Sequence, residues 1–196
     1  MSLNLTVVNP DGPGFVQAAP ASDFVVGASS SLNITSKDQI VAGSTIVPVD
    51  SQGRIAIFTQ PSADLVVDVG GWFTDQSNAA GSDGLFVALD TPRRVLDTRL
   101  GLGHAGRTGV DTRFDLSATG AALVGNLTVT SNVGAGFVQV GPAKTMIDGA
   151  TSSINTSTPD ETVANSVIAP VNEGIGVYTS NGTDVILDTS GYMTAA

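Results

Sequence analysis

The sequence predicts an all-β protein in which duplicated antiparallel β-sandwich lobes, jelly-roll-like in form, are joined by a bridging β segment. Three observations support this fold class. Apolar residues recur at every second position over short runs, turn-forming residues separate these runs, and one half of the chain repeats the other. No run keeps the periodicity of a helix over a convincing length.

Candidate strands follow one another from the N-terminus. Residues 3–7, 54–58 and 64–69 each place apolar side chains at alternate positions, which is typical of a strand with one buried face. Clusters of Asn, Asp, Gly, Ser and Pro separate such runs, at residues 9–14, 50–53, 60–62 and 181–182. Short strands with turns of this kind indicate an all-β sandwich or barrel.

The composition excludes several other classes. Of 196 residues, 41% are hydrophobic and 13% are charged, and the chain has one histidine and no cysteine. It is too apolar for disorder, and it has no thiol for a disulfide or a metal site. The net charge of −10 disfavours nucleic acid and anionic membranes as partners. No apolar run reaches the roughly 18 residues of a membrane-spanning helix.

The internal repeat is visible by direct comparison within the chain. The matched segments are residues 4–20 with 126–142, 27–33 with 149–155, and, after a two-residue deletion, 59–74 with 179–194. A match of this length indicates a duplication. We therefore expect the two copies to have the same strand order, with the deletion in the turn after Asp50 and Asn172. We also expect equal burial at four pairs of positions: Leu5, Val7, Phe15 and Val67 against Leu127, Val129, Phe137 and Leu187.

The repeat divides the chain into a first lobe, residues 1–75, a linker, residues 76–84, and a second lobe, residues 85–196. The second lobe begins with a segment that the first lobe lacks, residues 85–122, which holds five of the six arginines. A sheet that lacks strands has an unpaired edge, which natural proteins cover. We expect this bridging segment to cover the edge and to dock on both acidic lobes through Arg93, Arg94, Arg99 or Arg113. The alternative is a dimer through residues 3–19.

The order FVAL, RRVLDTR, GLG, GNLTVT, GFVQV, SSIN, VANSVIAPV and DVILDTSGY in residues 86–192 resembles a tandem all-β repeat of bacterial proteins. These proteins are secreted or associated with the cell wall, notably in actinobacteria and Chloroflexi. The resemblance covers residues 85–196 as a full repeat and residues 3–75 as one without its LDTR half. It implies an extracellular or cell-surface accessory module, and it implies no reaction and no cofactor.

Two functions are therefore open. The first is a non-catalytic extracellular structural or interaction module, with like modules as partners and a monomeric or homodimeric state. The alternative is a carbohydrate-binding module whose partner is a cell-wall or extracellular glycan. The weak candidates for ligand binding are Trp72, Tyr192, Arg99 and Asp97, with no catalytic residue and no metal ligand.

Asp97 and Arg99 are two residues apart, so in a strand they lie on one face. Arginine forks bind carboxylates and sugar acids, which makes this pair a candidate binding site. The other interpretation is an ion-pair network, with Arg93 or Arg94 nearby, that locks the bridging segment onto an acidic lobe. We favour the second interpretation because a chain with so few cations offers each of them many internal carboxylates.

Trp72 and Tyr192 hold equivalent positions in the two copies, and such aromatic side chains stack on sugar rings when they lie on an exposed β face. The other interpretation makes them core residues, as expected for Phe15 and Phe137. Asp64 and Asp68 recur as Asp184 and Asp188, about 13 Å apart within each pair along a strand. This spacing is too wide for one ion without other ligands, so we expect them to accept backbone N–H bonds.

The glycine-rich loop at residues 101–106 matches the letters G-x-G-x-x-G of a dinucleotide-binding turn. That site requires a strand before the loop and a helix after it, and no helix is expected here. We therefore interpret the loop as a β-turn and His104 as an exposed loop residue, with no catalytic role.

Overall fold

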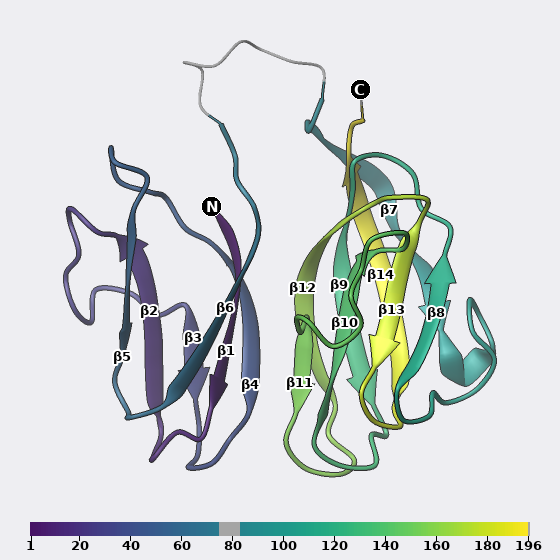
Figure 1. Cartoon of the computed structure of the whole chain (residues 1–196), viewed down its shortest axis with the longest axis horizontal. Coiled ribbons are helices and arrows are strands. Elements are labelled where there is room, and N and C mark those ends of the chain that lie inside the picture. The colour runs from purple at the N-terminus through teal and green to yellow at the C-terminus, as the bar shows by residue number, and fades with distance from the viewer. Residues whose placement is uncertain (75–82, 196) are drawn as a thin grey trace. The chain divides into compact units, whose positions relative to one another are not determined.

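The computed structural model describes residues 1–74 and 83–195 and is all-β with antiparallel strand pairing, as the sequence predicts (Figure 1). The chain forms two compact units, Met1–Phe73 and Thr74–Ala196. Most of the expected linker lies outside the described residues. Among the residues described, no helix has the length and hydropathy needed to cross a membrane.

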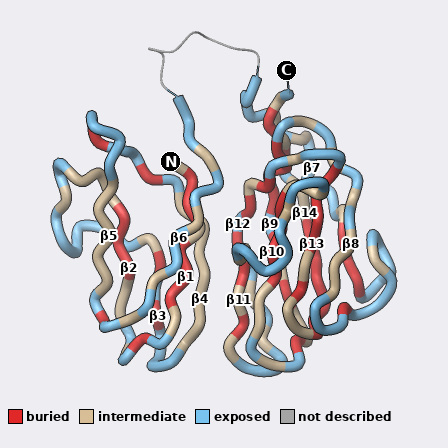
Figure 2. The backbone as a smooth tube through the Cα atoms, viewed as in Figure 1, coloured by how far each residue is buried: buried red, intermediate tan, exposed pale blue. Residues whose placement is uncertain are grey.

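Residues 1–74 contain two three-stranded sheets, ordered β4-β1-β6 and β3-β2-β5. Their strands are β1 (Ser2–Val8), β2 (Gly14–Pro20), β3 (Leu32–Ile34), β4 (Val41–Ile46), β5 (Ile55–Thr59) and β6 (Asp64–Gly71). Leu5 of β1, Val16 of β2 and Ile34 of β3 are buried together between the sheets. Figure 2 shows these buried positions in red on the strands of the first unit.

The described part of the second unit contains two four-stranded sheets, ordered β12-β9-β14-β7 and β11-β10-β13-β8. A short 3-10 helix, η1 (Thr98–Leu100), follows its first strand. The strands are β7 (Phe86–Asp97), β8 (Thr112–Leu116), β9 (Ala122–Thr130), β10 (Gly136–Pro142), β11 (Ile154–Thr156), β12 (Val163–Pro170), β13 (Ile175–Thr179) and β14 (Asp184–Met193). Leu127, Val177 and Leu187, from three different strands, are completely buried between the sheets.

The strand order of the second unit is that of a jelly roll. Counted from β7 as the first strand, one sheet runs first, eighth, third, sixth and the other second, seventh, fourth, fifth. The six strands of the first unit repeat the last six of the second, since β4-β1-β6 corresponds to β12-β9-β14 and β3-β2-β5 to β11-β10-β13. The expected identity of strand order is therefore present, and the first unit has no described counterpart of β7 and β8.

The copies also differ in length where the sequence places the deletion. The first unit closes the loop between β4 and β5 through Asp50, whose Oδ1 accepts the backbone N–H groups of Gln52 and Arg54 at 2.9 and 2.8 Å. The corresponding loop between β12 and β13 is shorter and turns through Glu173 and Gly174, both with positive φ. A tighter turn thus replaces the aspartate-centred one.

The bridging segment completes the second unit. β7 pairs with β14, and β8 pairs with β13. The expectation that this segment covers the edge of the first copy is therefore wrong. Ladder hydrogen bonds from β14 to β7 and from β13 to β8 satisfy the inner edges of both bridging strands, which makes them part of the sheets of the second unit.

The alternative dimer through residues 3–19 also needs correction. β1 lies between β4 and β6, and β2 lies between β3 and β5, so these two strands are central in their sheets. Their hydrogen-bonding groups already face neighbours on both sides, and a central strand cannot add a further strand. The edges next to the missing strands are those of β5 and β6.

Burial differs between the copies at one of the four expected pairs. Val67 on β6 is 38% exposed, whereas the equivalent Leu187 on β14 is completely buried. Leu187 pairs with Leu96 of β7, and β6 has no such neighbour among the described strands. Phe15 and Phe137 are each half-buried and pack against Phe58 and Tyr178, with ring centroids 5.8 and 5.9 Å apart, so the expectation that they are core residues is wrong.

Candidate functional site

The carboxylate of Asp97, at the end of β7, receives hydrogen bonds from two arginines. Arg99 donates from Nε to Oδ1 at 2.9 Å and from Nη2 to Oδ2 at 2.7 Å. Arg94 donates from Nη1 to Oδ2 at 3.0 Å. The Asp97 side chain is completely buried, so the two guanidinium groups compensate for the loss of water around its charge.

These contacts hold the pKa of Asp97 at about 2, below its usual value of 3.8. The hydrogen bonds from Arg99 are the largest cause, and burial acts in the opposite direction. The charge of Arg99 and the contacts with Arg94 lower the pKa further. A carboxylate with such a low pKa is a weak base at neutral pH, which does not suit proton transfer.

Arg94 extends the cluster from β7 to β14. Its Nε donates to Asp188 Oδ1 at 2.9 Å, and its Nη2 donates to Asp188 Oδ2 at 3.0 Å. The hydrogen bonds to Asp188 are also the main reason why the pKa of Arg94 is raised. Because β7 and β14 are the first and last strands of the unit, this bidentate pair joins the two ends of the jelly roll.

A second group of contacts attaches the residues after β7 to the start of β14. Thr98 Oγ1 donates to Asp184 Oδ1 at 2.7 Å and accepts the N–H of Val185 at 3.1 Å. Arg107 Nε lies 3.8 Å from Asp184 Oδ2. Thr108 donates to the Thr183 carbonyl from both its N–H, at 3.0 Å, and its Oγ1, at 2.9 Å. The loop is thus fixed at several points along β14.

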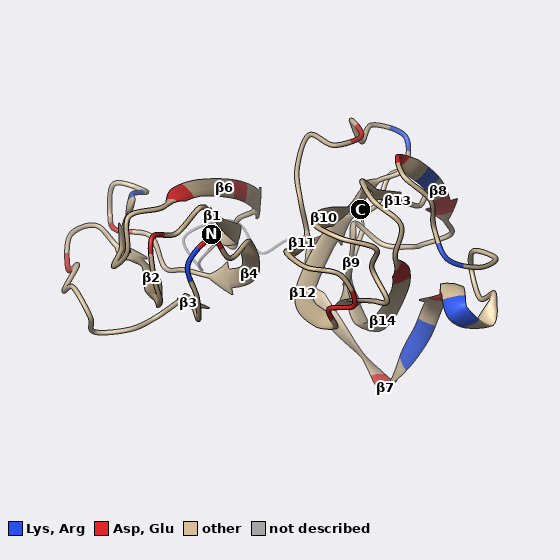
Figure 3. Cartoon of the chain, turned by 90° about the horizontal axis from the view of Figure 1, so that it is seen from below, with Lys and Arg blue, Asp and Glu red and all other residues tan. Residues whose placement is uncertain are grey.

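Arg113 of β8 forms the corresponding attachment on the other sheet. Its Nη1 donates to Asp148 Oδ1 at 2.8 Å, and its Nη2 contacts Asp115 Oδ1 and the carbonyl of Ala143. Asp148 and Ala143 belong to the loop between β10 and β11, so Arg113 joins the edge strand to that loop. Figure 3 shows basic residues on both β7 and β8.

The structure brings Asp97 and Arg99 together by a geometry that differs from the one expected. Arg99 belongs to η1 rather than to a strand, and its side chain folds back over the turn to reach Asp97. The ion pairs of the bridging arginines are made with aspartates of the second unit: Asp97, Asp115, Asp148, Asp184 and Asp188. The ion-pair network therefore fixes the bridging segment to the second lobe, where attachment to both lobes was expected.

Three of the repeated aspartates, Asp64, Asp184 and Asp188, accept hydrogen bonds from side chains, where backbone N–H donors were expected. Asp184 and Asp188 accept side-chain donors, from Thr98 and Arg94. Asp64 of the first copy accepts a hydrogen bond from Asn9 Nδ2 at 3.1 Å. Sequence reasoning missed the role of Thr98 and Asp184, although the repeated spacing of the aspartates was the available signal.

Trp72 and Tyr192 lie in different units and have different surroundings. Trp72, just after β6, is 78% exposed, and the adjacent Phe73 is 51% exposed. Tyr192 is half-buried in β14, where it pairs with Val87 of β7. Only the Trp72 ring therefore has the exposure that stacking on a sugar requires.

The glycine-rich loop is a series of turns, as expected. Gly101, Gly103 and Gly106 all have positive φ, which glycine adopts without strain, and β8 follows the loop. His104 is half-buried rather than exposed, with its ring centroid 4.4 Å from that of Phe114. Its Nδ1 lies 3.2 Å from the Gly106 carbonyl, so the ring stabilises the loop.

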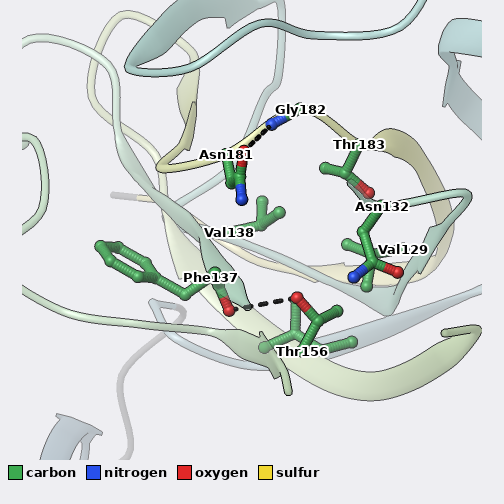
Figure 4. Close-up of a pocket in the computed structure, with 10 residues that line it drawn as sticks. Val129, Asn132, Phe137, Val138, Thr156, Asn181, Gly182 and Thr183 are labelled. Carbon is green, nitrogen blue, oxygen red and sulfur yellow. Dashed lines mark hydrogen bonds between the residues drawn. The ribbon is translucent and has the colours of Figure 1, made fainter. Parts of the chain in front are cut away.

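One hollow lies at the end of the second sandwich, between β10, β11 and the turn before β14 (Figure 4). Val129, Val138 and Ile154 line its apolar side, and Asn132 and Thr156 line its polar side. Asn132 is buried, and its Nδ2 donates to the Gly134 and Thr158 carbonyls at 2.8 and 2.6 Å. The hollow has room for a water-sized molecule and is too small for a sugar ring.

Within residues 1–74 and 83–195, no three His, Asp or Glu side chains are grouped so that they could hold a metal ion. Comparisons of the chain with models of protein families, with curated proteins and with solved structures gave no match.

Proposed function

We propose that this chain is a non-catalytic structural and interaction module of a bacterial protein at the cell surface or outside the cell. The observation that carries the proposal is the use made of the chain's arginines. Arg94, Arg107 and Arg113 form ion pairs that attach the bridging segment to the rest of the second unit, and Arg99 pairs with Asp97 inside that segment. The arginine and aspartate side chains best suited to binding or catalysis thus stabilise the fold.

Two further properties support an extracellular module. The chain has only two lysines and no cysteine. The motifs of residues 85–196 resemble a repeat of secreted and cell-wall-associated proteins, where such modules accompany other domains. The eight described strands of the second unit form a jelly roll, and the first unit repeats six of them, which gives a β-sandwich scaffold for that role.

A carbohydrate-binding function is the second candidate, and the exposure of Trp72 favours it. Trp72 and Phe73 present adjacent aromatic rings at the end of β6. Aromatic platforms bind sugars by stacking, and nearby Asp and Asn side chains supply hydrogen bonds to hydroxyl groups. Tyr192 is less available because β7 lies beside it.

A glycan array probed with the labelled full chain separates the two functions. The structural and interaction module predicts no specific retention on cell-wall or plant glycans. The carbohydrate-binding module predicts retention that Trp72→Ala abolishes and that Tyr192→Ala changes little, because only Trp72 is highly exposed. Retention lost in the Trp72 variant alone would overturn the structural proposal.

A further inference from the structure

The first unit has two strand edges where the second unit carries additional strands. β6 pairs with β1, and β5 pairs with β2, and no other strand of the described residues pairs with either of them. Their counterparts, β14 and β13, each pair with a second neighbour, β7 and β8. β5 contains no charged residue and no Pro, and the only residues of β6 that could protect an edge are Asp64 and Asp68.

Apolar side chains of β6 are exposed at positions where the equivalent side chains of β14 are buried. Val66 and Val67 are 46% and 38% exposed, and their counterparts Ile186 and Leu187 are 6% and 0% exposed. Phe73 is 51% exposed, and its counterpart Met193 is 9% exposed. The difference follows the presence of β7 beside β14, so the first unit exposes a surface shaped for a strand.

A glycine marks the place that a partner strand occupies in the second unit. A Cβ atom on Gly191 of β14 would lie 2.4 Å from the Phe86 ring and 2.5 Å from the Val87 carbonyl, both in β7. Gly71 is the equivalent residue of β6, and a Cβ atom there would meet nothing within 4 Å. Packing within the first unit therefore does not require glycine at this position, whereas the close approach of a strand like β7 does.

The aspartates of β6 lie at the positions equivalent to the aspartates of β14 that anchor β7. Asp68 and Asp64 occupy the positions of Asp188, which binds Arg94, and Asp184, which binds Thr98 and Arg107. Figure 3 shows acidic residues on β6 and basic residues on β7. A carboxylate accepts several hydrogen bonds at once, so existing contacts of these aspartates leave capacity for an arginine.

We propose that the β5–β6 edge of the first unit is a docking site for an extended polypeptide segment with the pattern of residues 86–116. This proposal rests on the proposed function as an interaction module and names its partner: the arginine-bearing segment of another repeat of the same kind. Its first strand would add to β6 and its second strand to β5. Such strand addition uses backbone hydrogen bonds for affinity and side-chain pockets for specificity.

A second copy of this chain is a less suitable source of the segment. Residues 86–116 of that copy are already paired with β14 and β13, so exchanging them would break as many contacts as it forms. A repeat whose segment is not already engaged loses nothing on docking. The partner is therefore an unengaged segment, and its chemistry is that of the sequence Arg-Val-Leu-Asp-Thr-Arg, extended up to the Asp.

The probe for this docking is a synthetic peptide of residues 85–117, added to the full chain. Trp72 is the single tryptophan of the protein, lies at the end of the proposed edge, and is absent from the peptide. Docking should shift Trp72 emission to the blue in a saturable manner and slow hydrogen exchange of the β6 amides. A peptide of the same composition in scrambled order should do neither.

Gly71→Val is the decisive variant. The added side chain points into open space in the unbound unit, so folding is preserved, but it occupies the place of the Phe86 ring and should abolish the response to the peptide. Asp68→Asn should weaken binding by about fivefold, because one arginine pair is lost. Asp23→Asn, the same change at an exposed loop of the first unit, should leave binding unchanged.

Each result has a separate meaning. No Trp72 shift with the ordered peptide, or an equal shift with Gly71→Val, would overturn the docking site. Light scattering that shows a dimer of the chain without peptide, lost in Gly71→Val, would identify a second copy as the occupant and overturn the present choice. Neither failure changes the glycan-array result, so the docking site and the proposed function are tested independently.

Discussion

The guanidinium of Arg94 binds the carboxylate of Asp188 through two parallel hydrogen bonds, with Nε to Oδ1 at 2.9 Å and Nη2 to Oδ2 at 3.0 Å. The third nitrogen of the same group, Nη1, reaches the buried carboxylate of Asp97 at 3.0 Å. One side chain therefore satisfies two carboxylates, one within its own strand and one on the neighbouring strand. This arrangement fixes β7 to β14 in a single register.

The first prediction tests this double contact. Arg94→Lys keeps the charge but lacks the planar fork, so it should lower the unfolding midpoint of the second unit almost as much as Arg94→Ala. Arg93→Ala is the matched control, since Arg93 is adjacent, exposed and without an ion pair among the described residues. Urea unfolding followed by circular dichroism measures all three. A Lys variant as stable as the wild type would show that the fork geometry is unimportant.

The second prediction concerns pH. The pKa of Asp97 is about 2 in the folded chain and 3.8 as its ordinary value, so ionised Asp97 stabilises the fold above pH 3.8. That contribution is lost as the pH falls from 3.8 towards 2. In this range Asp97 becomes protonated in the unfolded chain before it does in the folded chain, and the difference disappears once both are protonated. Asp97→Asn lacks this titration. Its deficit in stability against the wild type should be constant near neutral pH and should shrink through this window.

The measurement for Asp97 is the urea midpoint of both proteins at several pH values from 2 to 7. Comparing the wild type with the variant cancels the titration of the other carboxylates, which both proteins share. A deficit that does not change below pH 3.8 would contradict the assigned role of the arginine contacts.

The third prediction compares equivalent glycines. Gly191→Ala places a Cβ atom against the Phe86 ring and the Val87 carbonyl, so it should destabilise the second unit by roughly 2 kcal/mol through overpacking. Gly71→Ala enters open space and should change the stability of the first unit by less than about 0.5 kcal/mol. Hydrogen exchange resolved by mass spectrometry reports each unit separately. Similar costs at both positions would mean that β7 does not approach β14 this closely.

The strand architecture could be predicted from sequence because it depends on short-range patterns. Alternate apolar residues such as Leu3, Leu5 and Val7 produce a strand with one buried face, and they are all buried in β1. The internal match gave the correspondence of strands, and the structure has the same order in both units. These features need only periodicity and repetition.

The placement of the bridging segment could not be predicted in this way. Its arginines can pair with any nearby carboxylate, and aspartates at equivalent positions, such as Asp68 and Asp188, occur in both copies. β6 lies nearer to β7 along the chain than β14 does, so the choice depends on close packing between particular residues, such as Gly191 against Phe86, which composition does not contain. Arg99 was misplaced because it belongs to the single turn of η1, which the positive φ of Gly101 ends and which no alternation of apolar residues marks.

The last prediction uses one position of the repeat to measure what β7 contributes. Leu187 is completely buried and pairs with Leu96, so Leu187→Ala should cost about 3 kcal/mol of the free energy of unfolding of the second unit. Val67, at the same place in β6, is 38% exposed, so Val67→Ala should cost the first unit about 1 kcal/mol or less.

Hydrogen exchange of β1 and β2 reports unfolding of the first unit, and hydrogen exchange of β9 and β14 reports the second. Leu5→Ala, in a central strand of the first unit and completely buried, is the control that shows the first unit can register a large loss. If Val67→Ala were as costly as Leu187→Ala while Leu5→Ala behaved as a core substitution, another element would have to cover β6 in solution. Because β6 otherwise pairs only with β1 among the described strands, a small cost means that the apolar edge is available for the docking proposed above.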